Sequence, residues 1–505
     1  MASDKAILKK SPMRDLQQID EHYARMRERS EREDVMMFLN ACFASTNQAE
    51  FYVDQFTQAV SIHFLHRYVL ANYRTLYART LACDVNHANQ QAIILNLLAA
   101  GAPQRSVDRA EEGELIATTL QRLPANRAYQ LLTRLSQLKI NNRRSRAVVK
   151  RFLASRRDLV FDAVKYRRSF RNAAIHSHLK LAEEFGQFFF DLKGPRAFTT
   201  PLFERFRAAH YSAAALYELP YSVAESLAVR HQVPRAEFLK RIAPQMTANE
   251  KLRLRTSADR DGVTLGFDLA HAPLTRLALY VLSLSQTDRR ERQVELDQAL
   301  KQAAARAVKR NSARQNLGKV AAVLDRSYSA TGSRQKRNRP LAVALAADYL
   351  LHELSTEYLQ IWTPALPAEG TSLGVFAEGQ TSLATNVLEA IDWQPDWIVI
   401  VSDGFENDPP GMADQIAQAY QQLGNQVKPV QWVHCNPVFD SEHFAPRRLG
   451  STIPTVGLRD AEDLIVMIQF VNFVTGAASL GQLEQRLADV AAAYIHGTEP
   501  EAKTF

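Results

Sequence analysis

Residues 319–329 read KVAAVLDRSYS, and this stretch decides the fold of the C-terminal part of the chain. Its first part, Lys319–Leu324, is a short run of small and β-branched apolar residues, which is typical of a buried strand. Its last part, Asp325–Ser329, has the pattern DxSxS, and each of the three fixed positions carries a side-chain oxygen. The change from apolar to polar predicts a strand that ends where these oxygens begin.

Further apolar runs follow, and helical patterns lie between them. The expected strands are Lys319–Leu324, Tyr358–Trp362, Trp397–Ser402, Val427–His434 and Thr452–Val456, and the expected helices lie near Arg339–Leu354, Ser382–Ile391, Met412–Leu423 and Asp460–Val474. Such alternation predicts an α/β domain with a doubly wound, largely parallel sheet over residues 311–480. Ligands of this fold class bind at the carboxyl ends of the strands.

Hard oxygen donors gather at that edge of the expected sheet. They are Asp325, Ser327 and Ser329 after the first strand, Thr381 in a loop before a helix, and Asp403 at the end of WIVIVSDG. Carboxylates, hydroxyls and waters suit Mg²⁺ or Mn²⁺. A site this poor in charged ligands invites an outside carboxylate or phosphate as a further ligand. The two aspartates could also form an acid/base pair, but their hydroxyl neighbours favour a metal site. The alternative is a domain of this fold that holds no metal in the cell.

The N-terminal part reads as stacked helices. Residues 1–30 are polar and form an arm or an isolated first helix, whereas apolar residues recur at helical spacing over residues 31–310. Helix starts are expected at Thr200-Pro201, Ser222-x-x-Glu225, Pro234 and Thr247-x-x-Glu250. Many short helices without strands predict an all-α helical repeat, a HEAT-like solenoid or ring. Residues 481–505 are expected to form a C-terminal helix and tail.

Charge divides the chain in two. Residues 1–310 carry a net charge of +17, and residues 311–505 carry a net charge of −9. A basic half is typical of a protein that binds a polyanion. A basic surface without a partner would have the same composition.

The basic residues are densest in the segment from Leu138 to Arg171, which holds twelve Lys and Arg. Arginine side chains suit phosphate oxygens, and aromatic rings can stack on unpaired bases. The alternative is a solvated helix face whose aromatic residues, Phe152 and Phe170 among them, point into the core. The expected RNA-binding residues are Arg143, Arg144, Arg146, Lys150, Arg151, Arg156, Arg157, Lys165, Tyr166, Arg167, Arg168, Arg171, His176 and His178.

Other classes of protein are excluded by what the sequence lacks. Its three cysteines, Cys42, Cys83 and Cys435, are far apart and form neither a disulfide framework nor a CxxC metal site. No apolar run approaches the ~20 residues of a membrane span, and the charged N-terminus has no signal core. The sequence has no P-loop, HExxH or GxSxG motif. We expect a cytoplasmic, monomeric protein that is not an enzyme.

Two resemblances to known families follow from these motifs. The five oxygen-bearing residues resemble the metal-ion-dependent adhesion site (MIDAS) of the von Willebrand factor A (vWA) domain. That resemblance implies that Ser327, Ser329 and Thr381 bind the metal directly or nearly so, and that the aspartates bind it directly or through waters. Helical repeats before such a domain resemble the TROVE-domain family, which includes the Ro autoantigen and its bacterial relatives.

The residues that carry the second resemblance are KYRR at Lys165–Arg168, then His176, then HLK at His178–Lys180. The family has a similar KYR-x-R segment followed by a His and HLK, but its Trp before the first His is missing here. The resemblance implies a ring of helical repeats closed by the vWA domain. Such rings bind small noncoding RNAs on the outside and RNA ends in a basic hole.

Two classes of function are therefore expected. The first is a noncatalytic RNA-binding protein, a ribonucleoprotein component that grips small noncoding or misfolded RNA and its single-stranded ends. Its metal site would take an acidic protein ligand. The alternative is a vWA adaptor that works with a MoxR-type ATPase or another protein, which predicts a helical groove without net charge.

Overall fold

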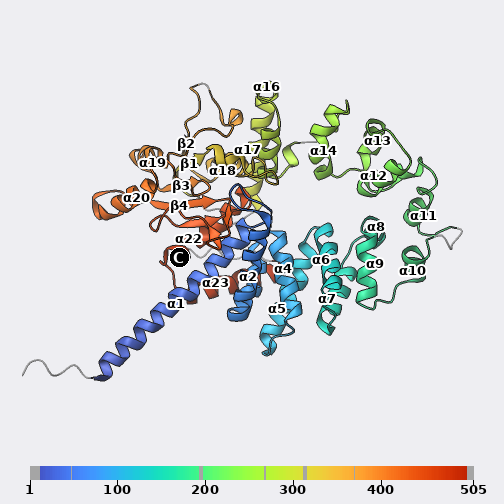
Figure 1. Cartoon of the computed structure of the whole chain (residues 1–505), viewed down its shortest axis with the longest axis horizontal. Helices are drawn as coiled ribbons and strands as arrows, with labels where there is room; N and C mark the ends of the chain where they lie inside the picture. Colours follow the sequence, from blue (N-terminus) through green and yellow to red (C-terminus); the bar gives the residue numbers. More distant parts are fainter. Residues whose placement is uncertain are drawn as a thin grey trace, which may run out of the picture.

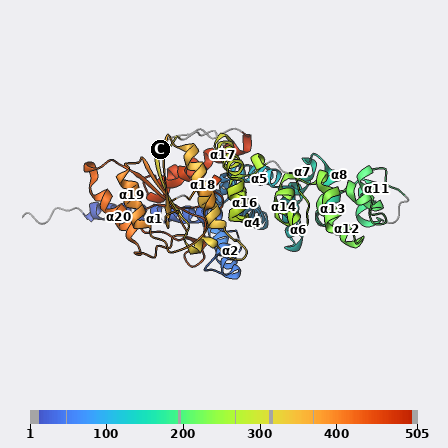
Figure 2. The same cartoon turned by 90° about the horizontal axis from the view of Figure 1, so that it is seen from above.

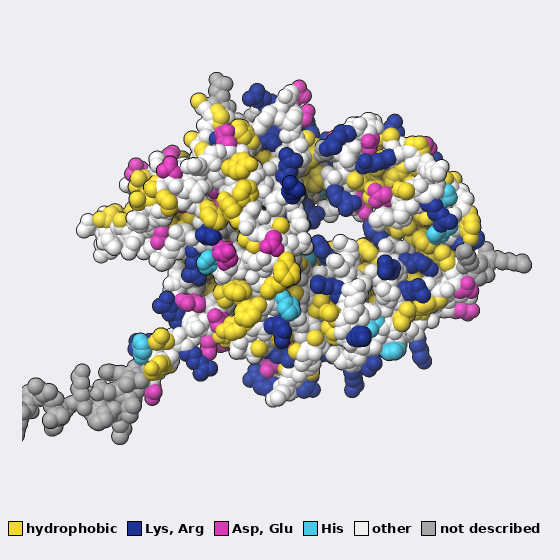
Figure 3. All heavy atoms as spheres, viewed as in Figure 1, with side chains coloured by type: hydrophobic (Ala, Val, Ile, Leu, Met, Phe, Trp, Pro, Cys, Tyr) yellow, Lys and Arg dark blue, Asp and Glu magenta, His cyan; other side chains and the backbone are white. Residues whose placement is uncertain are grey.

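The computed structural model describes residues 12–46, 48–192, 197–266, 269–310, 316–368 and 370–497. Helices form two arms around an opening, and an α/β domain lies at the end where the arms begin and finish (Figure 1). The space-filling view shows that side chains leave this opening free (Figure 3). The expected fold class, a helical-repeat region followed by an α/β domain, is confirmed. The first 11 residues of the expected arm and residues 498–505 of the expected tail lie outside the described residues.

The helical part is built from many short helices. They are α1 (Pro12–Ala44), α2 (Gln55–Asn72), α3 (Arg74–Arg79), α4 (His87–Ala99), α5 (Ser106–Arg122), α6 (Ala125–Gln137), α7 (Arg143–Ala154), α8 (Leu159–Lys165), α9 (Arg167–His176), α10 (Glu183–Phe190), α11 (Pro201–Ala208), α12 (Tyr221–Arg230), α13 (Arg235–Ile242), α14 (Ala248–Arg260), α15 (Leu274–Ser283), α16 (Gln286–Glu291) and α17 (Gln293–Arg310). The expected boundary at residue 30 falls inside α1, which runs on without a break to Ala44.

Most of the helix starts lie where the sequence predicts them. Thr247 accepts a hydrogen bond from the backbone N–H of Glu250, whose side chain accepts one from Thr247 in return. Pro201 occupies the first turn of α11, and Pro234 directly precedes α13. The expected start at Ser222 is wrong, because α12 begins one residue earlier, after Pro220. The side chain of Glu225 instead accepts a hydrogen bond from the Tyr221 hydroxyl.

Two rows of helices make the lower arm of Figure 1, and the view from above separates α5 and α7 of one row from α4 and α6 of the other (Figure 2). Helices α2, α4, α6 and α9 pack successively in one row, and α3, α5 and α7 form the other. Helix α8 packs on α11 and α12 and so connects the lower arm to the upper one. Figure 1 places α7 below α6, on the side of the lower arm away from the opening.

The α/β domain has a parallel five-stranded sheet in the order β2-β1-β3-β4-β7. Its strands are β1 (Lys319–Asp325), β2 (Glu357–Thr363), β3 (Trp397–Val401), β4 (Gln431–Asn436) and β7 (Thr455–Gly457), with a separate two-stranded hairpin of β5 (Phe439–Asp440) and β6 (Ala445–Pro446). Its helices are α18 (Arg339–Leu354), α19 (Leu383–Asp392), α20 (Met412–Gln422), α21 (Leu464–Met467), α22 (Val471–Thr475) and α23 (Leu480–His496). The hairpin was not expected, and the single helix expected over Asp460–Val474 is broken by short 3₁₀ turns.

Alternate residues of the strands pack into two different hydrophobic clusters, one on each face of the sheet. Val320, Ala322 and Leu324 of β1 join one continuous apolar cluster that also contains α18 and the helical arms. Ala321 and Val323 face the other side, where they pack with apolar residues of α19 and α20. Helices therefore cover both faces of the sheet, and one face shares its core with the ring.

The α/β domain closes the ring from both ends. Helices α15 and α17 of the upper arm pack on α18, while α1 packs on β6, β7 and α22. Helix α23, at the end of the chain, packs on α3 and α5 of the lower arm. Among the described residues, no helix has the length and apolar character needed to cross a membrane.

Candidate functional site

The five expected metal ligands lie together at the carboxyl edge of the sheet. Strands β1 and β3 are neighbours, so Asp325 at the end of one and Asp403 after the other line the same small pocket. The backbone N–H of Ser327 donates to Asp325 Oδ1 at 2.7 Å, and the hydroxyl oxygens of Ser327 and Ser329 are 3.2 Å apart. Thr381 is fully buried beside them.

The electrostatics of this cluster suit a cation. Burial and the nearby Asp403 carboxylate raise the pKa of Asp325 to about 7. Burial also raises the pKa of Asp403, although a hydrogen bond with Ser329 opposes the shift. The Thr381 hydroxyl lies close enough to lower the pKa of Asp325, yet its buried oxygen has no well-formed hydrogen bond. A hard divalent cation would offset both carboxylates and use the free Thr381 oxygen, so the residues fit the expected Mg²⁺ or Mn²⁺.

A residue from outside the α/β domain covers part of this site. Tyr52, between α1 and α2, packs its ring on Phe405 with centroids 4.5 Å apart. Burial and Asp403 raise the pKa of the Tyr52 phenol, and a hydrogen bond with Ser329 lowers it. The sequence did not indicate Tyr52, because it lies far from the DxSxS motif along the chain and only the tertiary fold brings the two together.

The basic segment has two sets of cations on α7. Arg144 pairs with buried Glu112 at 2.5 Å, and Arg151 pairs with Glu114 at 2.7 Å, both across the contact with α5. Arg143, Arg146 and Lys150 follow one another at helical spacing on a different face. They have no ion pair with any residue that the structure describes. Only the second set leaves its charge free for a ligand.

Three more expected RNA contacts have structural partners. Arg156 pairs with buried Asp162 at 2.5 Å, and Lys165 pairs with Glu250 at 3.4 Å. Arg167 donates to the backbone carbonyl of Phe188 at 2.7 Å. These cations hold neighbouring helices together and are poor candidates for phosphate contacts.

The aromatic residues of the segment belong mainly to the core. Phe152 and Phe170 are buried, so neither can stack on a base in the folded protein. Half-buried Tyr166 stacks on Tyr129 with ring centroids 4.8 Å apart. Burial therefore excludes base stacking by Phe152 and Phe170, and the stack on Tyr129 already uses one face of the Tyr166 ring.

The two histidines differ in their surroundings. The Nε2 atom of His176 lies 3.0 Å from the backbone carbonyl oxygen of Ile140. His178 is exposed, with a positive φ of 51°. Apart from Arg167, which donates to backbone carbonyls, the cations of the segment without an ion pair among the described residues are Lys139, Arg143, Arg146, Lys150, Arg157, Arg168 and Arg171.

A second cationic feature was not predicted from the sequence. A pocket of about 850 Å³ lies where both arms meet the α/β domain, with lining residues from α4, α6, α15, α17 and α18. We call it the junction pocket. Arg127, Arg276, Arg310 and Arg337 line it together with Lys336, Arg339 and Arg459. Figure 3 shows Lys and Arg side chains on both rims of the opening next to it.

One sequence signal could have indicated the junction pocket. Arg127 and Arg276 each lie in the first turn of a helix, α6 and α15, and neither first turn has an acidic residue. Cations are unfavourable at helix N-termini, where the backbone already carries partial positive charge. Arginines at such positions indicate a site that attracts anions.

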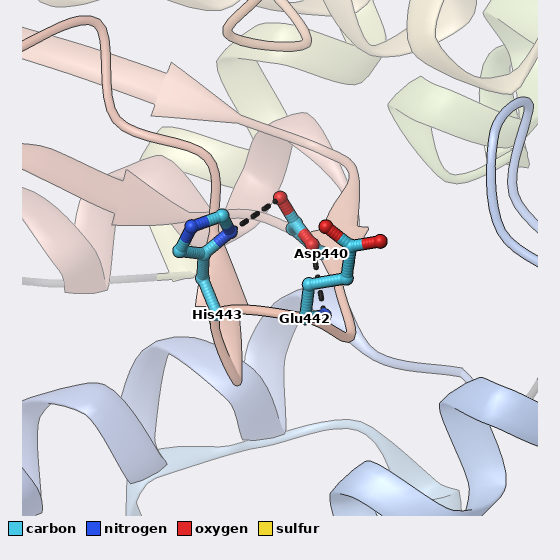
Figure 4. A group of neighbouring side chains, drawn as sticks. All are labelled: Asp440, Glu442 and His443. Carbon is cyan, nitrogen blue, oxygen red and sulfur yellow. Dashed lines mark hydrogen bonds and ion pairs between the residues drawn. The ribbon is translucent and has the colours of Figure 1, made fainter.

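A third cluster, Asp440, Glu442 and His443, lies in the β5–β6 hairpin (Figure 4). Asp440 accepts hydrogen bonds from the Glu442 backbone N–H and from His443, both at 3.0 Å, and pairs with Arg447 at 3.3 Å. The oxygens of Asp440 therefore already have partners that stabilise the turn, and we do not assign a metal site to this cluster.

Comparisons with known proteins give a structural likeness. No model of a protein family matches the chain, and no curated protein matches its sequence. Among solved structures, the chain is similar to the Ro (RSR) protein of Deinococcus radiodurans at 15% sequence identity and a TM-score of 0.48, over 82% of this chain and 93% of that chain.

Proposed function

We propose that this chain is a noncatalytic RNA-binding protein of the Ro type, in which a closed ring of helices grips RNA through free cations. The observation that supports it is the unpaired basic face of α7, formed by Arg143, Arg146 and Lys150, on a ring whose opening also has cationic rims. Phosphate contacts of this kind bind RNA without reading its sequence. They suit small noncoding or misfolded RNAs of varied sequence.

The ligand is expected to reach two surfaces. A folded RNA would contact the α7 side of the lower arm, and a single-stranded end would reach the opening. The residues we propose for the first contact are Arg143, Arg146, Lys150 and Arg157. The KYRR…HLK resemblance to the TROVE-domain family agrees with this proposal.

The vWA-like domain adds a metal site in this proposal. Asp325, Ser327, Ser329, Thr381 and Asp403 would hold Mg²⁺ or Mn²⁺, which would take a carboxylate of a partner as a further ligand. We propose a monomer in the cytoplasm. The alternative, an adaptor for a MoxR-type ATPase, predicts a helical surface without net charge. The basic face of α7 makes this alternative less favourable.

The direct test is purification of the full chain in low salt. Co-purified nucleic acid would raise the absorbance at 260 nm relative to that at 280 nm, and ribonuclease but not deoxyribonuclease should remove it. Binding of a labelled RNA by fluorescence anisotropy should weaken steeply with salt. Protein that is free of nucleic acid and binds no added RNA would contradict the function.

A further inference from the structure

Four arginines of the junction pocket have no carboxylate partner within the described part of the chain. They are Arg127, Arg276, Arg310 and Arg337, and all four are exposed. Within the described residues, the side chain of Arg127 donates to Gln130 at 3.3 Å and that of Arg276 to Asn249 at 3.0 Å. Neutral partners do not offset these charges. Like charges around one pocket repel each other, and a bound anion would remove that cost.

The carboxylates of the lining do not balance its cations. Asp460 pairs with Arg339 at 2.5 Å and with Arg459 at 2.9 Å. Glu462 accepts hydrogen bonds from the backbone N–H and the hydroxyl of Thr275, in the first turn of α15, at 3.3 and 2.6 Å. The third carboxylate, Asp84, faces Arg459 and Arg122 at the edge of the pocket. Three carboxylates against seven Lys and Arg leave the lining with an excess of positive charge.

Backbone N–H groups and neutral side chains of the lining can also donate hydrogen bonds to an anion. The first turns of α4 and α6 line the pocket through His87 and Arg127, and helix N-termini favour anions. Burial and Arg459, Arg127 and Arg276 lower the pKa of His87 to about 4. The buried hydroxyl oxygen of Thr46, also in the lining, has no hydrogen-bond partner.

We propose that the junction pocket binds a phosphate group of high charge, supplied either by the end of an RNA or by a free nucleotide. Arginine side chains bind phosphate oxygens with paired hydrogen bonds, and the pocket has room for more than one phosphate. Both arms and the α/β domain contribute to the lining, so the bound phosphate also ties the ring together. The RNA source rests on the proposed function, whereas the free nucleotide does not.

The test compares RNAs of one sequence that differ only at their ends. The full chain, in EDTA so that the metal site takes no part, is titrated with labelled RNA ending in a 5′-phosphate, a 3′-phosphate or hydroxyls. One phosphate-ended RNA should bind about ten-fold more tightly than the hydroxyl-ended RNA, as one or two charge-assisted contacts would give. The double variant Arg127→Ala/Arg276→Ala should lose this difference and keep the affinity for the hydroxyl-ended RNA. The control, Arg290→Ala, removes an exposed arginine of α16 outside the pocket and should behave like the parent.

A second measurement separates the two sources of phosphate. Inorganic pyrophosphate and ATP, each without metal, should raise the melting temperature of the parent and not that of the double variant. A shift by ATP without any preference among RNA ends assigns the pocket to a free nucleotide. If no RNA binds, but pyrophosphate raises the melting temperature of the parent and not of the double variant, the proposed RNA-binding function is refuted and the phosphate site is supported. Equal binding of all three RNAs together with no shift by pyrophosphate or ATP overturns the proposal. Should the double variant not fold, Arg310→Ala/Arg337→Ala gives the same comparison.

Discussion

The carboxylate of Glu50 and the ammonium of Lys336 form a buried ion pair between the segment that follows α1 and the loop that precedes α18. Burial raises the pKa of Glu50 and lowers that of Lys336, so each charge depends on the other. Backbone groups of Ala49 hold the same two segments together through Ser333 and Gln335, at 2.6 and 2.9 Å. This contact fastens the beginning of the lower arm to the α/β domain, between the metal site and the junction pocket.

The first prediction concerns this ion pair. Lys336→Ala leaves the Glu50 carboxylate buried without a partner and should lower the free energy of unfolding by about 3–5 kcal/mol. The measurement is chemical denaturation followed by circular dichroism. The double variant Glu50→Gln/Lys336→Gln removes both charges and should lose clearly less. If the single and double variants are equally unstable, the attraction between these two charges does not account for the stability of the contact.

The second prediction concerns the metal. Mg²⁺ or Mn²⁺ should raise the melting temperature because the ion binds only the folded α/β domain. Asp325→Ala should abolish the shift and leave RNA binding nearly unchanged, since the basic face of α7 lies on the helical arm. A variant that responds to Mn²⁺ like the parent would refute the assignment of this site.

The same site predicts a dependence on pH. The pKa of Asp325 is raised to about 7, so its carboxylate is largely protonated at pH 6 and charged at pH 8. Protons compete with a cation for this group, and the affinity for Mn²⁺ should fall as the pH decreases through 7. Isothermal titration calorimetry at both pH values measures this change. An affinity that does not change between them would contradict the role of Asp325.

The sequence predicts the α/β domain well because its strands are short apolar runs, which can be recognised without knowledge of tertiary contacts. It predicts the helix start at Ser222 incorrectly because Pro220, with its fixed backbone angle, starts α12 at Tyr221 first. The gathering of the oxygen-bearing residues could be predicted because Asp325 ends β1, Asp403 comes shortly after β3 and Thr381 shortly before α19. The pairing of Arg144 with Glu112 depends on how α5 packs against α7, and composition does not record it.

The third prediction concerns the aromatic residues of the basic segment. Phe170 is buried among Tyr129, Phe185 and Phe189, so Phe170→Ala should cost about 3–5 kcal/mol of stability. Tyr166→Leu should cost less and leave the affinity for single-stranded RNA within about two-fold, because its ring stacks on Tyr129. Denaturation and anisotropy measure the two effects. A Tyr166→Leu variant of parental stability that loses single-strand binding would restore a stacking role.

The fourth prediction concerns Tyr52. Its phenol lies close enough to Ser329, an expected metal ligand, for the serine to lower its pKa, so Tyr52→Phe should leave the serine freer and tighten Mn²⁺ binding about three- to ten-fold. Titration calorimetry gives the affinity directly. The matched control is Tyr328→Phe, since exposed Tyr328 lies inside the DxSxS motif without a comparable contact in the described chain. Weaker metal binding in Tyr52→Phe would show that the phenol assists the metal instead of competing with it.

The last prediction uses the two sets of cations on α7 as each other's control. Each phosphate contact contributes about −0.7 to the slope of log K against log salt on a single strand and about −0.9 on a double helix. Replacing Arg143, Arg146 and Lys150 together with Ala should therefore flatten the slope by about 2 to 3 if all three reach phosphate. The triple variant should weaken binding to RNAs of unrelated sequence to the same extent, because phosphate contacts carry no sequence information.

The double variant Arg144→Ala/Arg151→Ala removes cations from the same helix, but these already pair with Glu112 and Glu114. It should lower stability and leave the slope unchanged. Equal slopes in the parent and the triple variant, with the fold intact by circular dichroism, would mean that this face of α7 is ordinary solvated surface.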